Sequence, residues 1–446
     1  MIDHYRPICT LSNIPKMLGR LVLLPMQRAL SLFLAAGQHG FLRGRSTVTN
    51  LLEFQEYALC GVAGCCQVDL VSTDFAKAFD RLSHHHNMVQ DIILAKLDSV
   101  GVHGALLAWF SGYLSDRSLV VRIKGALSAP FLTSSGVPQG SHIGPLLFLL
   151  VIDSVVEMFK GLPVLLFADD LKVFFRVGSA RDCRRIQAAL DRLSVWCGQN
   201  SLHLNPSKCS IVSFYRSDSF TCFDYHINGI ALNRLTSVVD LGILFDSRLS
   251  MTDHINRISA RAMKTLGFLK RNTRDFQDIP ALVTLYRSLV VPTLEYGLVV
   301  WSPFYAAHIH QLEHVQHKFL RYVAYKLRIP GENVNYQELM GLCGLRILEA
   351  RRAWADFAFF SLLVSGALDC PHLVEQTITA SFLHPKQHHS GGKKRNPFFP
   401  PERCCLRCKN DAVMVYNEKT TFFQVKNANE CALLNVAVNP VCPVEV

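Results

Sequence analysis

The sequence has 446 residues, of which 50% are hydrophobic and 18% are charged. This composition is typical of a folded globular chain with room for two or three domains, and it excludes a wholly disordered chain. The formal net charge of +11 is compatible with a polyanionic partner such as nucleic acid. The 15 cysteines are odd in number and scattered, so we expect reduced thiols and no disulfide framework.

No membrane span or secretory signal is predicted. Apolar runs are interrupted before about 18 residues, for example by Asp153 and Glu295. The opening residues MIDHYRPICTLSN lack a basic segment followed by an apolar core. We therefore expect an intracellular protein, nuclear or cytoplasmic, that is not secreted and has no membrane partner. The chain begins like the middle of a domain, so we expect an N-terminal truncation.

The first third of the chain alternates helical and extended patterns. Apolar spacing predicts a helix over 14–35, and the Gly- and Arg-rich loop GQHGFLRGRST (37–47) leads into a second helix, VTNLLEFQEYAL. Alternating apolar and polar residues over 65–75 predict a strand that ends at Asp74. Helical segments are predicted over 87–97 and 102–114.

The next segment carries a loop and two adjacent acids. The stretch SLVVRIKGALSAPFLTSSGVPQGS (118–141) predicts a strand, a turn and a strand that close in a Gly- and Pro-rich loop. GPLLFLLVIDSVVEMF (144–159) predicts one buried helix. In VLLFADDLKVFF, apolar runs flank a very short link, which predicts a β-hairpin with Asp169 and Asp170 at its tip.

Helices dominate the remainder. An amphipathic helix is predicted over 180–197, and the loop LHLNPSKC leads into a strand. VVDLGILFD (238–246) predicts one further short strand. Helical patterns with regular Lys and Arg continue from 254 to about 360, and the residues after 383 read as a linker or disordered tail.

The acids suggest a metal site. Burying a carboxylate costs several kcal/mol unless a cation or donors compensate it. If the strand ending at Asp74 neighbours the hairpin, its carboxylate can converge with Asp169 and Asp170. Hard oxygen ligands suit Mg²⁺, and two such ions can clamp the attacking and leaving oxygens of phosphoryl transfer. The alternative is that adjacent acids are ordinary turn residues.

Two other features have a functional and a structural interpretation. Gln139 and Ser141 in the Gly- and Pro-rich loop could contact a sugar and base, or could belong to a structural turn. Phe79 follows Asp74 by five residues and could block a ribose 2′-hydroxyl, or could pack in the core.

Several motifs together resemble a known family. STDFAKAFDRLSH, SSGVPQGSHIGPLLFLL, FADD, LNPSKC and VVDLGILFDSRLSMTDHI occur in this order and resemble the palm motifs of reverse transcriptases. The sequences of these motifs are most similar to those of non-LTR, LINE-like retrotransposons of the jockey type. YRPICTLSNIPKML and QHGFLRGRSTVTNLL resemble the finger motifs. The likeness covers roughly residues 5–360.

The resemblance implies an α+β right-hand polymerase with an antiparallel-sheet palm, partial fingers and a helical thumb. The expected boundaries are partial fingers over 1–70, palm over 71–250, a thumb-like region over 251–360 and a partly disordered tail over 361–446. It also implies an RNA-directed DNA polymerase that uses two Mg²⁺ ions, with Mn²⁺ as a substitute, and that takes an RNA template, a DNA primer and deoxynucleoside triphosphates.

Residue roles follow from the same resemblance. The catalytic residues would be Asp74, Asp169, Asp170 and Lys208, and the first three would be the metal ligands. The substrate-binding residues would be Arg6, Phe79 as the steric gate, Gln139, Gly140 and Ser141. The nucleic-acid-binding residues would be Arg43, Arg45, Gly242 in the primer-grip segment, Arg257, Arg261 and Lys264. For the last three, a solvated helix face is the alternative.

Departures from the family pattern leave other functions open. The family usually reads Gly-Phe-Arg in the second finger motif, and Leu42 stands at the third position here. An inactive, nucleic-acid-binding relic of such an element is therefore the alternative to an active polymerase. An RNA-directed RNA polymerase would share the palm, but Phe79 in place of a small polar gate argues against it.

Overall fold

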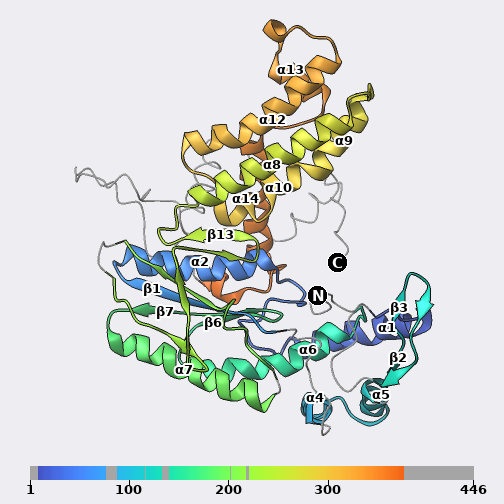
Figure 1. Ribbon diagram of the computed structural model, residues 1–446, viewed down its shortest axis with the longest axis vertical. Coiled ribbons are helices and arrows are strands. Elements are labelled where there is room, and N and C mark those ends of the chain that lie inside the picture. The colour runs from blue at the N-terminus through green and yellow to red at the C-terminus, as the bar shows by residue number, and fades with distance from the viewer. Residues whose placement is uncertain are drawn as a thin grey trace. The chain divides into compact units, whose positions relative to one another are not determined.

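The computed structural model describes residues 9–76, 88–115, 117–132, 140–200, 202–216 and 220–375 (Figure 1). The predictions for Arg6, Phe79, Gln139 and the tail after 383 fall outside these described residues. The chain divides into two compact units, Met1–Thr265 and Leu266–Val446. The description below takes each unit by itself.

A five-stranded sheet organises the first unit. Its strand order is β11 (Asn233–Leu235), β8 (Ser210–Phe214), β1 (Gln67–Thr73), β7 (Asp170–Val177) and β6 (Val164–Phe167). Only the β11–β8 pair is parallel, and β1 is central with β7 and β8 antiparallel on either side. The predicted α+β fold with an antiparallel sheet is confirmed.

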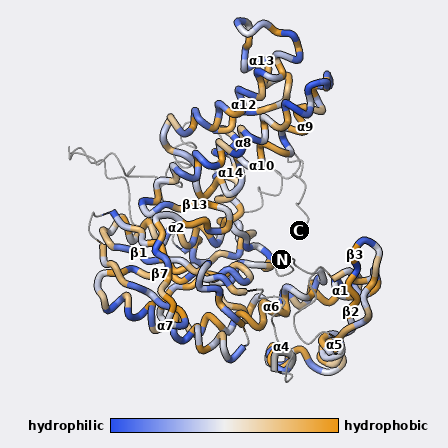
Figure 2. Tube along the Cα trace, viewed as in Figure 1, coloured by the Kyte–Doolittle hydropathy of each residue, from blue (hydrophilic) through white to orange (hydrophobic). Residues whose placement is uncertain are grey.

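Helices cover both faces of this sheet (Figure 1). On one face lies α2 (Thr47–Ala63), whose buried Phe54 makes edge-on ring contacts with Phe174, Phe214 and Phe245 at centroid distances of 5.2–5.6 Å. On the other face lies α7 (Ala180–Gln199), which alternates hydrophobic and hydrophilic residues (Figure 2) and buries its apolar side in the core. Strand residues alternate between these two apolar layers because side chains have a period of two along a strand.

Peripheral elements complete the first unit. The N-terminal helices are α1 (Asn13–Leu30), α4 (Met88–Ser99) and α5 (Gly104–Leu114). The short strands β2 (Ser118–Leu119), β3 (Arg122–Ile123), β4 (Ala126–Leu127) and β5 (Phe131–Leu132) confirm the predicted strand–turn–strand. Two more strands, β9 (His226–Ile227) and β10 (Ile230–Ala231), form a small hairpin.

Two sequence predictions are wrong. The predicted helix over 144–159 is α6 (Gly144–Ile152) followed by the 3₁₀ helix η3 (Asp153–Phe159). The helix changes at Asp153, whose side chain accepts a hydrogen bond from the backbone N–H of Ala35 at 2.7 Å. The single strand predicted over 238–246 is a hairpin, β12 (Ser237–Asp240) and β13 (Ile243–Asp246), because Leu241 and Gly242 turn the chain with φ of +43° and +90°.

The second unit is helical, as the sequence predicts. Helix α8 (Thr252–Asn272) spans the division, and α9 (Ile279–Leu289), α10 (Val291–Glu295), α11 (Leu298–Trp301), α12 (Ala306–Lys326), η4 (Gly331–Asn333), α13 (Tyr336–Leu342) and α14 (Leu348–Val364) follow. The buried rings of Tyr286 and Phe319 stack at 4.1 Å in its core. None of the helices in the described ranges is long and apolar enough to cross a membrane.

Candidate active site

The strand register brings two predicted acids together. Thr73 in β1 and Leu171 in β7 form the last pair of this antiparallel ladder, and Asp74 and Asp170 are the next residues beyond it, close enough for the charge of Asp74 to act on Asp170. Directly opposed residues of antiparallel strands share one face of the sheet and lie about 5 Å apart at Cβ. The two carboxylates, 96 positions apart in the sequence, therefore meet at one sheet edge.

The predicted hairpin around Asp169 is confirmed. Phe167 in β6 pairs with Asp170 in β7, so Ala168 and Asp169 alone form the connecting loop. Asp169 is half-buried at the tip, and Asp170 is the first residue of β7. The hairpin thus presents both acids beside the end of β1.

The pKa of Asp170 is raised, first by burial and then by neighbouring negative charge. Burial against the sheet edge raises the pKa of this carboxyl to about 6, with smaller contributions from the charges of Asp169, Asp240 and Asp74. The residue nevertheless retains surface that is exposed to solvent. A carboxylate whose ionised form is disfavoured by other carboxylates is one that a bound cation would stabilise.

One carboxylate oxygen of Asp74 has an ion-pair partner but no hydrogen-bond donor among the residues that the structure describes. The Nζ of Lys208 lies 3.3 Å from Oδ2 of Asp74. That oxygen is buried, and none of the residues described in the structure donates a hydrogen bond to it. The backbone N–H of Asn205 donates to the carbonyl of Asp74 at 2.8 Å, which fixes the loop carrying Lys208 beside the strand end.

The structure adds one pair that the sequence analysis missed. Lys172 lies two residues after Asp170 on the same face of β7, is 4% exposed, and donates a hydrogen bond to Asp240 at the end of β12. Its ammonium also lies 5.2 Å from the ring centre of Phe54. Burial lowers the pKa of Lys172, and Asp240 opposes that effect. The sequence signal for a buried charge pair was a lysine inside the apolar run LKVFF.

The donor set fits Mg²⁺ in type. No three His, Cys, Asp or Glu side chains in the described ranges converge closely enough to hold a metal by themselves. Mg²⁺, however, is usually bound through one or two carboxylates together with substrate phosphates and waters. The pair Asp74 and Asp170, with a buried oxygen that lacks a donor and a raised pKa, meets that smaller requirement.

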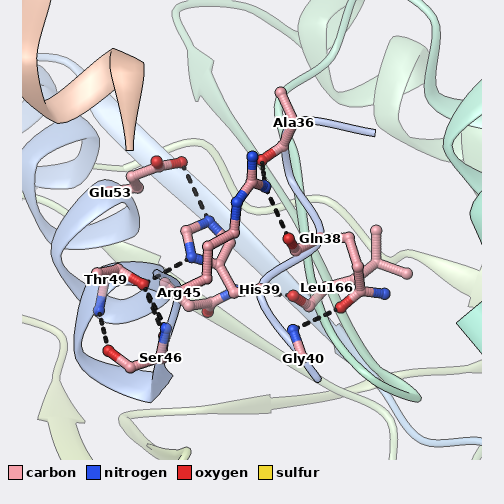
Figure 3. Close-up of polar contacts among 10 residues, drawn as sticks. Ala36, Gln38, His39, Gly40, Arg45, Ser46, Thr49, Glu53 and Leu166 are labelled. Carbon is pink, nitrogen blue, oxygen red and sulfur yellow. Dashed lines mark hydrogen bonds and ion pairs between the residues drawn. The ribbon is translucent and has the colours of Figure 1, made fainter. Parts of the chain in front are cut away.

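The loop over 37–47 packs against the hairpin strand (Figure 3). The Arg45 guanidinium donates to the carbonyls of Ala36 and Gln38 at 2.5 and 2.7 Å, so it is engaged inside the loop. Arg43 is exposed, whereas Leu42 is buried in the core at the place where the family usually has Arg. Thr49 in α2 bonds to Nδ1 of His39 at 2.8 Å, which ties the loop to that helix.

The remaining described site residues lie on loops and an exposed helix face. Gly140 has φ of +101°, and the Ser141 hydroxyl accepts a hydrogen bond from the backbone N–H of Gly144 at the start of α6. Gly242 occupies the tip of the β12–β13 hairpin. Three basic side chains are exposed along one side of α8, with the spacing i, i+4 and i+7: Arg257, Arg261 and Lys264.

Acids from a central strand and an adjacent hairpin, on an antiparallel sheet covered by helices, define the palm of a nucleic-acid polymerase. Residues 2–269 match the family model described as reverse transcriptase (RNA-dependent DNA polymerase). The chain belongs to the reverse transcriptase family.

Curated relatives come from mobile elements. The chain is 26% identical over 332 residues to the probable RNA-directed DNA polymerase from transposon BS of Drosophila melanogaster, covering 72% of this chain and 36% of that protein. It is 27% identical to the corresponding protein from transposon X-element of the same species, covering 72% and 35%. It is 26% identical to the RNA-directed DNA polymerase from mobile element jockey of Drosophila funebris, covering 72% and 36%. The chain thus spans just over a third of these relatives.

Among solved structures, apo telomerase from Candida tropicalis is similar to this chain with a TM-score of 0.38 and 11% sequence identity. The alignment covers 73% of this chain and 60% of the telomerase chain.

Proposed function

We propose that this chain is the RNA-directed DNA polymerase segment of a non-LTR retrotransposon of the jockey type. The observation that carries the proposal is the register that sets Asp74 beside Asp170 in a chain of the reverse transcriptase family. Carboxylates paired at a sheet edge, one with a buried oxygen that lacks a hydrogen-bond donor, are suited to divalent metal and phosphate rather than to a structural turn.

The reaction joins a deoxynucleotide to a primer. The primer 3′-hydroxyl gives its proton to solvent, and its oxygen bonds to the α-phosphorus of the deoxynucleoside triphosphate. The bond from that phosphorus to the bridging oxygen breaks, and pyrophosphate leaves. Two Mg²⁺ ions, or Mn²⁺ in their place, would neutralise charge on the attacking and leaving oxygens. An RNA template selects the nucleotide by base pairing.

The acids at the sheet edge supply the binding groups. Asp74, Asp169 and Asp170 would hold the ions, with Asp170 at the first position of β7. Lys208 would approach the pyrophosphate and donate a proton to it; its Nζ lies 3.3 Å from Oδ2 of Asp74, which supports this role. A lysine in this position acts as a compact, mobile charge, which suits a leaving group.

Substrate contacts surround this centre. Gln139, Gly140 and Ser141 line the nucleotide pocket, Arg6 binds the triphosphate, and Phe79 excludes the ribose 2′-hydroxyl. The exposed basic face of α8 and the Gly242 hairpin tip contact the template and primer. Phosphate contacts of this kind make binding sensitive to salt.

The proposed organisation follows these roles. Partial fingers occupy residues 1–70, the palm 71–250 and a helical thumb 251–360. A polymerase of this kind works in the cytoplasm or nucleus, wherever its RNA template meets a primer.

Template and sugar selection test the proposal. The purified chain is incubated with oligo(dT) on poly(rA), and separately with a DNA primer on heteropolymer RNA, in Mg²⁺ or Mn²⁺. We expect incorporation of deoxynucleotides on RNA and little incorporation of ribonucleotides. Preferred use of ribonucleotides would identify an RNA polymerase. Binding of template and primer with no incorporation of either sugar would favour the inactive relic, to which the buried Leu42 in place of an Arg also points.

Phe79→Val provides the matched control for sugar choice. A smaller side chain at the gate is expected to raise ribonucleotide incorporation at least tenfold while deoxynucleotide incorporation changes little. An unchanged ratio would remove Phe79 from the gate without affecting the assignment as a polymerase.

A further inference from the structure

The buried side chain of Gln38 forms hydrogen bonds with the backbone of the β6–β7 hairpin. Oε1 of Gln38 accepts hydrogen bonds from the backbone N–H groups of Ala168 at 3.1 Å and Gly40 at 2.8 Å. Nε2 of the same carboxamide donates to the carbonyl of Ala168 at 3.4 Å. Gln38 is 0% exposed and lies 130 positions before Ala168. Both polar backbone groups of Ala168 are therefore bound by a single side chain.

Ala168, to which Gln38 is bonded, has an unusual backbone conformation. Ala168 has φ of +57°, in the left-handed region that a β-carbon disfavours. It is the first of the two loop residues in the hairpin, a position that glycine usually fills when only that residue has positive φ. The next residue is Asp169. The backbone angles of Ala168 therefore decide where the carboxylate of Asp169 lies.

The loop that carries Gln38 is built for this close approach. The N–H of Leu166 donates to the carbonyl of Gly37 at 2.8 Å. The N–H of His39 donates to the carbonyl of Leu166 at 2.9 Å, as Figure 3 shows. A β-carbon on Gly37 would lie 2.4 Å from the carbonyl oxygen of Val164. These contacts hold the loop alongside β6, immediately before the hairpin tip.

Gly40 completes the fit on the other side of Gln38. A β-carbon on Gly40 would lie 2.3 Å from the backbone nitrogen of Ala168. The two glycines of GQHG thus leave room for backbone on either side of the glutamine. Within the part of the chain that the structure describes, the Gln38 carboxamide supplies the bonds from this motif to Ala168.

We infer that Gln38 is a positioning residue for Asp169: its carboxamide holds Ala168 in the left-handed conformation and so aims the Asp169 carboxylate at the metal and the incoming nucleotide. The inference rests on the proposed function for the role of Asp169. Because Gln38 is 0% exposed, it acts through the backbone of Ala168. A purely structural role would change the stability of the fold without changing metal affinity, and the two are separable.

Asn50 offers a matched control. Its side chain is also 0% exposed and donates to the same strand, at the carbonyl of Leu166, over 3.0 Å. Asn50→Leu therefore removes a buried hydrogen bond to β6 without touching Ala168. Gln38→Met removes all three hydrogen bonds that the Gln38 side chain makes to Ala168 and Gly40, while it keeps the length of the side chain. Gln38→Glu keeps the two accepted bonds but loses the donated one.

Mn²⁺ binding to the full chain, followed by electron paramagnetic resonance, is the principal test. Gln38→Met is expected to weaken the Mn²⁺ affinity about tenfold, because supporting residues of metal ligands commonly matter by 10–100-fold. Asn50→Leu is expected to bind as the unchanged chain does. Where Gln38→Met fails to fold, Gln38→Glu replaces it and is expected to lose at least about threefold in affinity.

A second substitution tests the conformational step itself. In Gln38→Met with Ala168→Gly, the left-handed conformation no longer carries the cost of a β-carbon, so a substantial part of the Mn²⁺ affinity should return. Nucleotide incorporation should follow the same order, with kcat lowered and KM for the nucleotide unchanged. Equal Mn²⁺ affinity in the unchanged chain and Gln38→Met, an equal loss in Asn50→Leu, or no saturable Mn²⁺ binding at all would overturn the inference.

The two proposals fail in different ways. An unchanged chain that binds Mn²⁺ through a Gln38-dependent site but incorporates no nucleotide would overturn the polymerase assignment and keep the role of Gln38. Nucleotide incorporation that does not depend on Gln38 would keep the polymerase assignment and overturn the positioning role of Gln38.

Discussion

The buried ammonium of Lys172 is bonded to the carboxylate of Asp240, 68 positions further along the chain. This pair joins the strand that begins with Asp170 to the hairpin that carries Gly242 at its tip. The side chains are only 6% and 11% exposed, so each charge depends on the other for compensation.

Breaking this pair from one side should be costly. Asp240→Asn leaves the Lys172 ammonium buried without its counter-charge and should lower the free energy of unfolding by about 3 kcal/mol. Replacing both residues, as Lys172→Met with Asp240→Leu, should restore stability to within about 1 kcal/mol. Urea unfolding of the single and double variants measures the coupling. A cost below that of the more exposed Arg351–Glu295 pair, about 1 kcal/mol at most, would show that the pair has no such role.

His254 should make stability depend on pH. Its ring is 2% exposed, its Nδ1 accepts a hydrogen bond from the Leu244 backbone, and burial followed by the charge of Arg257 lowers its pKa to about 4. Since the unfolded state takes up a proton near pH 6.5 and the folded state does so only near pH 4, stability is full above 6.5 and falls between these values. The loss at pH 5 should be about 2 kcal/mol.

The measurement is urea unfolding at pH 7 and pH 5, compared with a variant that cannot titrate. His254→Gln should flatten the pH dependence. His103 is exposed, and His103→Gln should leave the pH dependence of stability unchanged. An identical pH profile in His254→Gln and the unchanged chain would contradict the prediction.

Gly40 should tolerate no side chain. A β-carbon there would meet the backbone nitrogen of Ala168 at 2.3 Å, and the backbone of a two-residue hairpin loop that Gln38 holds by hydrogen bonds cannot move aside cheaply. Gly40→Ala should therefore lower the free energy of unfolding by about 2–3 kcal/mol. The control is Gly112→Ala in α5, where no atom lies within 4 Å and helix propensity should raise stability by up to about 1 kcal/mol. Equal effects at the two positions would refute the close packing.

Crowded carboxylates should cost stability when no cation is bound. Asp170→Asn removes one charge from the cluster of Asp74, Asp169 and Asp240. The melting temperature in a chelator at pH 7.5 should rise by about 2 °C, and the further rise that Mg²⁺ causes in the unchanged chain should shrink. Differential scanning fluorimetry with and without Mg²⁺ measures both. A lower melting temperature in the chelator would contradict the charge crowding.

The elements of the palm could largely be predicted from the sequence because each has a local signal. Apolar runs around a two-residue link predict the hairpin at Asp169, and alternation predicts the strand before Asp74. The hairpin at Asp240 was missed because its turn depends on Leu241 in a left-handed conformation, for which leucine gives no signal.

Contacts across long sequence separations had no such signal. Two contacts depend on how strands and loops are brought together: the pair of Lys172 with Asp240 and the hydrogen bonds of Gln38 to Ala168. The motif containing Gln38 could be matched to a family, but only the structure relates its side chain to the hairpin.

The most direct test of the account is metal-dependent incorporation of one deoxynucleotide on an RNA template by Asp74→Asn and Asp169→Asn, measured in a single turnover. The exposed Asp98→Asn is the control. The account predicts a loss of at least about 10³-fold in both palm variants at unchanged template–primer affinity, and no loss in the control. Incorporation at the unchanged rate in either palm variant would contradict it.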